Sequence, residues 1–282
     1  MSSLAPTIDL RGAPDGPGVA MPRLGLGTWP MDDAQTERAV ATAIETRYRL
    51  FDTAENYRNE RGVGLGMRAS GLPRDQLFVT TKFNREWHGK DLVREVFGRS
   101  ADLLAVDYID LLLIHWPNPG HDRYVEAWEG MIKLQEEGLV RAIGVSNFKP
   151  AHLERLRVAT GILPAVNQVQ LHPLIARPEA RVYHAQHGIV TESWSPVEKG
   201  GDLLSHPAIT DIAEQHRKTP AQVVLRWHLE LGLVPIPKSA DPGRMRENIE
   251  VFDFTLTTEE IAAISALNRG EGAGADSDRI GH

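Results

Sequence analysis

The chain has 282 residues, of which 41% are hydrophobic and 24% are charged, as in an ordinary globular protein with a sizeable core. Its net charge of -7 argues against a nucleic-acid-binding surface, and the absence of cysteine excludes disulfides and thiol chemistry. No apolar run approaches the ~20 residues that cross a bilayer, and no signal peptide is apparent at the start. We therefore expect a cytoplasmic protein with no nucleic-acid or membrane partner.

The sequence begins with a predicted β-hairpin over residues 7–22, because TIDL and VAMP alternate on either side of the turn APDGPG. Short apolar runs and amphipathic segments then alternate along the chain. Strands are expected at 24–28, 48–53, 77–82, 108–115, 141–146, 165–170, 189–194 and 233–238. Helices are expected at 33–46, 59–70, 90–104, 122–137, 150–160, 178–187, 219–231 and 243–250, with additional ones at 206–217 and 257–268.

Eight strand–helix units without a composition break predict a single domain folded as a (β/α)8 TIM barrel. Its parts are the hairpin, the barrel at about 23–250, and a C-terminal helix and tail at about 257–282. An open doubly wound sheet is the alternative, and it usually begins with a glycine fingerprint after a strand. The only candidate, GVGLG at 62–66, falls inside a helical segment and is interpreted as helix packing.

Polar or aromatic side chains stand where seven of the predicted strands end. In a barrel of this kind the C-terminal ends of the strands carry the chemistry, so these side chains should converge on one rim. They are Asp52, Lys82, His115, the pair Ser146–Asn147, Gln168, Trp194 and Lys238.

Four of the residues near this rim predict a general acid. A tyrosine hydroxyl has an ordinary pKa of about 10, and a nearby Lys82 should lower the pKa of Tyr57 toward working pH. Asp52 should pair with Lys82 and keep its ammonium group charged. His115 follows four apolar residues, which should hold it neutral and able to orient a carbonyl oxygen. Tyr57 in this setting can protonate a carbonyl oxygen while a hydride reaches the carbon bonded to that oxygen.

Six motifs resemble the aldo-keto reductase family, closest to its bacterial diketogluconate reductase and prostaglandin F synthase-like branch. The resemblance covers residues 19–268 and implies an NADPH-dependent reductase that converts aldehydes and ketones to alcohols. It also implies a small-molecule carbonyl substrate and a monomeric protein. The motifs are LFDTAENYRNE, TTKF, LLLIHWP, GVSNF, NQVQLHP and IPKSADPGRMREN.

The resemblance also assigns residues. It makes Asp52, Tyr57, Lys82 and His115 the catalytic tetrad, with Tyr57 as the acid. Trp194 would stack on the nicotinamide ring, whose carboxamide would be held by Ser146, Asn147 and Gln168. The remaining cofactor groove would be lined by Thr28, Ser195, Pro196 and Val197.

At the nucleotide end, the resemblance places Lys238, Ser239 and Arg244 on a 2′-phosphate, which favours NADPH over NADH. Glu247 and Asn248 would contact the adenine. The substrate pocket would be bordered by Tyr57 and His115, the C-terminal tail, and Trp29, Asn84, Trp87 and Trp116. Asn84 departs from the tryptophan that many relatives carry there.

Two other functions remain open from the sequence. One is a regulatory subunit that binds NADPH but turns over slowly, and the other is a metal-dependent barrel hydrolase. The pair His184 and His187 has helical spacing but no accompanying third ligand, so we expect no metal site. The intact tetrad favours the reductase.

Overall fold

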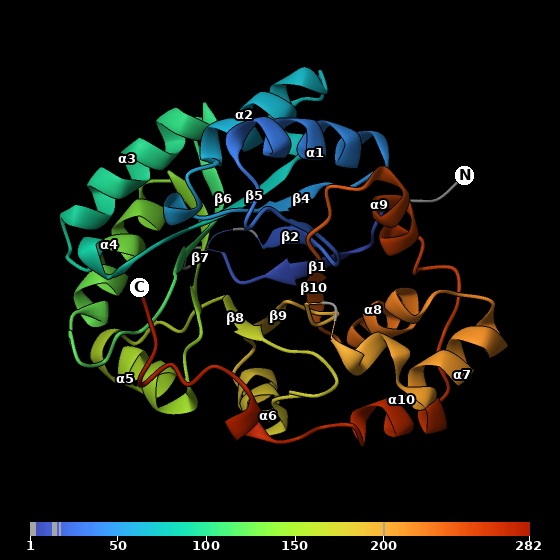
Figure 1. Cartoon of the computed structure of the whole chain (residues 1–282). Coiled ribbons are helices and arrows are strands. Elements are labelled where there is room, and N and C mark those ends of the chain that lie inside the picture. Colours follow the sequence, from blue (N-terminus) through green and yellow to red (C-terminus); the bar gives the residue numbers. More distant parts are fainter. Residues whose placement is uncertain (1–3, 13–15, 17, 200) are drawn as a thin grey trace.

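The computed structural model describes residues 4–12, 16, 18–199 and 201–282. Eight parallel strands follow one another around a barrel in chain order from β3 to β10, and the helices lie outside them (Figure 1). The barrel strands are β3 (Leu26–Gly27), β4 (Leu50–Asp52), β5 (Phe78–Phe83), β6 (Ile109–Ile114), β7 (Val140–Ser146), β8 (Val166–Gln170), β9 (Val190–Trp194) and β10 (Val234–Ile236).

The ring closes between its first and last strands. Gly25 N donates to Pro235 O at 3.2 Å and Gly27 N donates to Pro237 O at 3.1 Å, beside a parallel bridge between Gly27 and Lys238. The predicted (β/α)8 barrel is therefore confirmed.

The helices match the predicted segments to within two or three residues. Apolar side chains on their inner faces and on the outer faces of β3 to β7 form the largest core cluster. The helices are α1 (Asp33–Glu45), α2 (Glu60–Ala69), α3 (Leu92–Leu104), α4 (Tyr124–Glu136), α5 (Pro150–Thr160), α6 (Pro178–Gln186), α7 (Pro207–His216), α8 (Pro220–Glu230), α9 (Pro242–Ile249) and α10 (Thr258–Ser265). None of these described helices is long and apolar enough to cross a membrane.

An antiparallel hairpin closes the barrel at the N-terminal ends of its strands. It consists of β1 (Thr7–Leu10) and β2 (Val19–Pro22), as predicted, although residues 13–15 and 17 of the APDGPG turn lie outside the described part of the chain. Leu10 and Met21 are buried in the same cluster as Leu50 and Leu111 from the barrel interior. The end of the barrel that the described residues leave open to a ligand is therefore the opposite rim.

The GVGLG segment lies within α2, where its glycines allow close helix packing. A Cβ atom at Gly62 would lie 2.3 Å from the carbonyl oxygen of Asp33, and one at Gly64 would lie 2.3 Å from that of Leu104. Any side chain at either position would push α2 away from its neighbours. The interpretation of this segment as helix packing is confirmed.

The tail after α10 returns to the open rim. Lys149, the residue before α5, forms ion pairs with Asp276 and Asp278 at 2.6 and 2.5 Å, so the tail is tied to the barrel wall. At its far end the carbonyl oxygen of His282 accepts a hydrogen bond from Arg85 N. The tail thus brings His282 to the substrate side of the rim.

Candidate active site

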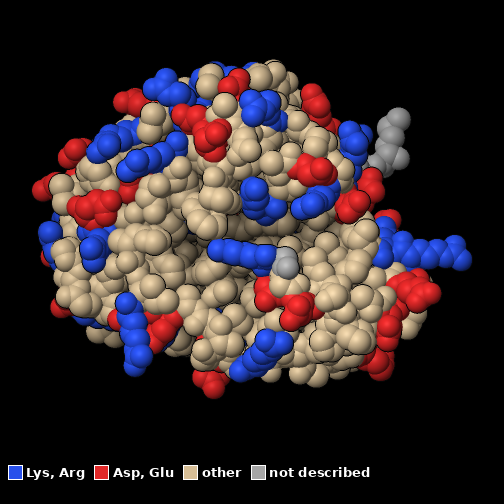
Figure 2. All heavy atoms as spheres, in the orientation of Figure 1, with Lys and Arg blue, Asp and Glu red and all other residues tan. Residues whose placement is uncertain are grey.

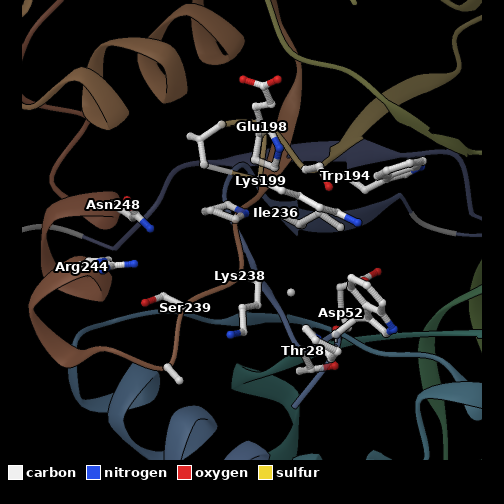
Figure 3. A pocket seen from close by; sticks show the side chains of 18 of the residues that line it. Thr28, Asp52, Trp194, Glu198, Lys199, Ile236, Lys238, Ser239, Arg244 and Asn248 are labelled. Carbon is white, nitrogen blue, oxygen red and sulfur yellow. Dashed lines mark hydrogen bonds between the residues drawn. The ribbon is translucent and has the colours of Figure 1, made fainter. Parts of the chain in front are cut away.

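A cavity of about 1250 Å³ opens at the C-terminal ends of the strands. Figure 2 shows this face hollowed near its centre, with lysine and arginine side chains along the hollow. In Figure 3, Arg244, Ser239 and Asn248 lie at one end of the cavity, and Asp52 and Trp194 lie at the other. The predicted residues that line it are Thr28, Trp29, Asp52, Tyr57, His115, Trp116, Asn147, Gln168, Trp194, Ser195, Pro196, Val197, Lys238, Ser239, Arg244, Glu247 and Asn248.

Lys82 lies beneath the cavity floor and is held by three oxygen atoms. Its Nζ atom is 2.6 Å from Asp52 Oδ1, 3.0 Å from Thr53 O and 3.5 Å from the Tyr57 hydroxyl. Burial alone would lower the pKa of Lys82, but the negative charge of Asp52 and the interaction with Tyr57 outweigh it and raise the pKa above its ordinary value. The lysine is therefore a fixed positive charge beside the tyrosine.

The pKa of Tyr57 differs from the value expected from the sequence. Burial raises the pKa of Tyr57 above its ordinary value, and the opposing effect of the Lys82 charge does not cancel that increase. The expected fall of this pKa toward working pH is therefore wrong for the protein without ligand, because desolvation of the phenolate is the larger effect. The tyrosine stays protonated, which is the state that a proton donor requires.

His115 at the end of β6 faces Tyr57, with ring centroids 5.8 Å apart. Burial, followed by the charges of Lys82 and His282, holds the pKa of His115 well below its ordinary value, so the imidazole is neutral as predicted. Its Nδ1 atom lies 3.0 Å from Oδ1 of the Asn84 side-chain amide, an acceptor, so the ring proton lies on Nδ1 in this arrangement. Since this amide can present oxygen or nitrogen, Asn84 determines which ring nitrogen carries the proton. A proton on Nε2 requires the amide nitrogen of Asn84 to face Nδ1.

Gln168 of β8 joins two buried carboxyl groups. Its Nε2 atom donates to Asp52 Oδ2 at 2.8 Å and to Glu192 Oε2 at 2.7 Å. Burial, reinforced by the charge of Asp52, raises the pKa of Glu192 to about 8. Among the described residues, nothing donates to the amide oxygen of Gln168, which is left free for a ligand in the cavity.

Ser146 and Asn147 already have partners within the protein. The Ser146 hydroxyl is buried and donates to Gln168 O at 2.9 Å. The Asn147 amide donates to His115 O at 3.1 Å and accepts from Trp194 Nε1 at 2.9 Å. This last bond fixes the plane of the Trp194 ring against the cavity. Ser146 lies behind the cavity wall, so its hydroxyl would have to change partner to hold a carboxamide.

Lys238, Ser239 and Arg244 surround the start of α9 at the far end of the cavity. The backbone N–H of Arg244, however, donates to the Asp241 carboxylate at 2.8 Å, which caps the helix. Arg244 N is therefore not available to an anion at this helix start. The groups that can attract an anion here are the side chains of Lys238, Ser239 and Arg244.

Two residues predicted to border the substrate pocket lie outside its lining. Asn84 is buried behind His115, and Trp87 packs under the guanidinium group of Arg99, 4.9 Å from the ring centroid. Both follow β5, but the chain turns into a short 3-10 helix there and carries Trp87 away from the cavity. Their expected contact with substrate is not supported by this arrangement.

Other lining residues were missed by the sequence analysis. Lys199 places its Nζ atom 4.4 Å from the ring centroid of Trp29, across the cavity mouth. His282 packs against Trp116 with ring centroids 6.1 Å apart. The tail was expected to border the pocket, but nothing in the sequence singled out His282 or Lys199. Glu192, which does not line the cavity, was also missed, although it is the only acid in the strand IVTESW.

Among the described residues, no three His, Cys, Asp or Glu side chains are grouped as metal ligands. His184 is buried, with its ring nitrogens 2.9 Å from Asn167 and 2.8 Å from Thr191. His187 stacks on Tyr183. The pair His184 and His187 thus has other contacts.

Comparisons with known proteins agree with this geometry. The family described as "Aldo/keto reductase family" matches residues 23–269. A methylglyoxal reductase DkgA of Yersinia pestis is 48% identical over 266 residues, covering 94% of this chain and 95% of that protein. A crystal structure of an aldo/keto reductase from Brucella melitensis is 44% identical, with a TM-score of 0.88, over 93% of this chain and 99% of the other. An Asp-to-Ala variant of Gox0644 in complex with NADPH has a TM-score of 0.92 and 42% identity over 99% of both chains.

The barrel and its rim site define an oxidoreductase. The chain belongs to the aldo/keto reductase family, and the resemblance inferred from the six motifs is confirmed.

Proposed function

We propose that this protein reduces small aldehydes and ketones to alcohols with NADPH, and that Tyr57 is the general acid. The observation that carries the proposal is the contact of the Tyr57 hydroxyl with the buried Lys82 ammonium group at the floor of the cavity. A protonated phenol beside a fixed positive charge can release its proton to an oxygen, because the charge stabilises the phenolate that remains.

The residues present fit a bound NADPH. The cavity, at about 1250 Å³, exceeds the usual 300–1,000 Å³ of small-ligand pockets, so it has room for a dinucleotide and a small substrate. The free oxygen of Gln168 can accept from a carboxamide, and the Trp194 face can stack on a ring. Lys238 and Arg244 supply positive charge at the other end. The related Gox0644 variant was crystallised with NADPH.

The reaction needs a hydride and a proton, and bound NADPH supplies the hydride. The protein side chains handle the proton. Neutral His115 would orient the carbonyl oxygen toward the Tyr57 hydroxyl, and a hydrogen bond from its Nε2 would require the Asn84 amide to turn its nitrogen to Nδ1. As the carbonyl carbon gains the hydride, its oxygen takes the proton of Tyr57, and Lys82 stabilises the phenolate. Water then returns a proton to Tyr57, and the alcohol leaves.

The substrate side of the cavity is partly aromatic, with Trp29, Trp116 and His282 around Tyr57 and His115. Compact carbonyl compounds are the first candidates, because the relative from Yersinia pestis is named a methylglyoxal reductase. We expect NADPH oxidation, followed as loss of its absorbance, with methylglyoxal and with a reactive aromatic aldehyde. If neither these nor a wider carbonyl panel are reduced while NADPH binds tightly, the regulatory alternative replaces the reductase. We further propose, from the family resemblance, a monomer that works in the cytoplasm.

Arg244→Ala should weaken NADPH binding about tenfold to a hundredfold, the loss of one charge-assisted hydrogen bond to the 2′-phosphate. NADH lacks that phosphate, so its affinity should hardly change. Equilibrium titration of tryptophan fluorescence measures both affinities, and the NADPH effect should shrink as salt rises. The control is Arg246→Ala, a neighbouring exposed arginine on α9 that does not line the cavity. Equal losses for both cofactors would refute the phosphate assignment.

A further inference from the structure

Glu192 lies inside the barrel, one level below Trp194 on the same face of β9. It is fully buried, and its strand neighbours in register are Gln168 of β8 and Val234 of β10. Among the described residues, the charged groups that act on it are Asp52 and then Lys82. Glu192 therefore belongs to the buried network under Tyr57, although it touches neither the cavity nor the tyrosine.

This network holds more negative than positive groups. Lys82 is its one cation, and its direct bond goes to Asp52 at 2.6 Å. Glu192 receives a single hydrogen bond, from Gln168 to Oε2, while Oε1 has no partner among the described residues. An ionised carboxylate buried with one oxygen unpaired costs far more than a neutral carboxyl group in the same place. The arrangement suits one ionised acid, Asp52, and one neutral acid, Glu192.

Gln168 connects this pair to the cofactor side of the cavity. Both amide hydrogens are used, one on each carboxyl group, so the amide cannot flip without facing two acceptors with its oxygen. Asp52 alone would orient only one hydrogen. Glu192 is the second anchor that keeps the free oxygen of Gln168 directed to the cavity.

We propose that Glu192 is a positioning residue for carbonyl reduction: through Gln168 it fixes the acceptor for the cofactor's carboxamide, and as a neutral acid it leaves the Lys82 charge available to Tyr57. The inference rests on the proposed function, since it concerns the same site. When Glu192 loses its proton, a second negative charge faces Lys82 and opposes formation of the Tyr57 phenolate. Hydride transfer should then slow.

The first test compares pH profiles of the single-turnover rate of NADPH oxidation. In the natural protein we expect the rate to fall about tenfold as pH rises through about 8, where Glu192 ionises. Glu192→Gln keeps the acceptor oxygen and cannot ionise, so it should remain active and lose this fall. Glu60→Gln, a buried carboxyl group bonded to Thr81 outside the network, is the matched control and should keep the natural profile. Identical profiles for the natural protein and Glu192→Gln would overturn the proposal.

The second test does not depend on catalysis. The infrared difference spectrum between the natural protein and Glu192→Gln at pH 6.5 should contain the carbonyl band of a protonated carboxyl group, and the band should vanish at alkaline pH. Absence of this band would refute the proposal that Glu192 is neutral, even if carbonyl reduction is demonstrated. If the band is present and no carbonyl compound is reduced, the proposed function is refuted, whereas the neutral state of Glu192 is supported.

The third test addresses the amide. Glu192→Leu removes the second anchor, and we expect about tenfold weaker NADPH binding, whereas Glu192→Gln should bind NADPH as the natural protein does. If Glu192→Gln keeps the natural NADPH affinity and Glu192→Leu does not, the affinity depends on the hydrogen bond from Gln168 and not only on packing. Equal loss in both variants would overturn the role assigned through Gln168, and circular dichroism of each variant verifies that it is folded.

Discussion

Tyr57→Phe should reduce the rate of carbonyl turnover by at least ~10²-fold and leave NADPH affinity near its natural value. The substitution removes one oxygen atom and its proton, while the ring beside His115 and the bond between Lys82 and Asp52 remain. The loss of turnover therefore measures the contribution of the Tyr57 proton alone. Steady-state kinetics gives the rate, and fluorescence titration gives the affinity.

Tyr183→Phe is the matched control for this variant. Tyr183 lies on α6, its hydroxyl contacts Glu154 at 3.3 Å, and it does not line the cavity. We expect Tyr183→Phe to reduce carbonyl compounds at the same rate as the natural protein. If Tyr57→Phe also retains natural turnover, another group delivers the proton and the assignment of Tyr57 is wrong.

Lys82→Met should damage both activity and stability. Turnover should fall by ~10² or more, because the phenolate of Tyr57 loses its stabilising charge. Asp52 would be left buried without its partner, and breaking a buried ion pair in this way costs about 3–5 kcal/mol of unfolding free energy. Urea unfolding followed by circular dichroism measures the second effect.

The double variant Asp52→Asn with Lys82→Met separates the two losses. Removing both charges should restore part of the unfolding free energy, since no uncompensated charge remains, while turnover stays low. Recovery of turnover together with stability would mean that Lys82 acts only on the fold, and its proposed role beside Tyr57 would be withdrawn.

The barrel could be predicted because each strand and helix left a local pattern, and the convergence of Asp52, Lys82 and His115 follows from parallel strands ending at one rim. What escaped prediction depends on contacts between distant segments. Trp87 was expected to border the substrate pocket, but a short 3-10 helix turns it outward. No local pattern shows where a loop or a tail returns.

The pKa of Tyr57 was predicted in the wrong direction for a related reason. The sequence places a lysine near the hydroxyl but does not reveal how completely the barrel excludes water around both. Burial proved the larger effect. Glu192 was overlooked although the alternation of β9 places it on the same face as Trp194, inside the barrel.

The hairpin that closes the barrel has a practical meaning for protein engineering. Met21 and Leu10 pack against the barrel interior at the end opposite to the cavity, and neither of them lines it. Substitutions there would change expression and heat tolerance without changing which carbonyl compounds are accepted. Libraries aimed at new substrates should therefore diversify the rim around Trp29, Trp116 and His282 and begin from a parent strengthened at the hairpin, where extra stability can absorb the cost of altered loops.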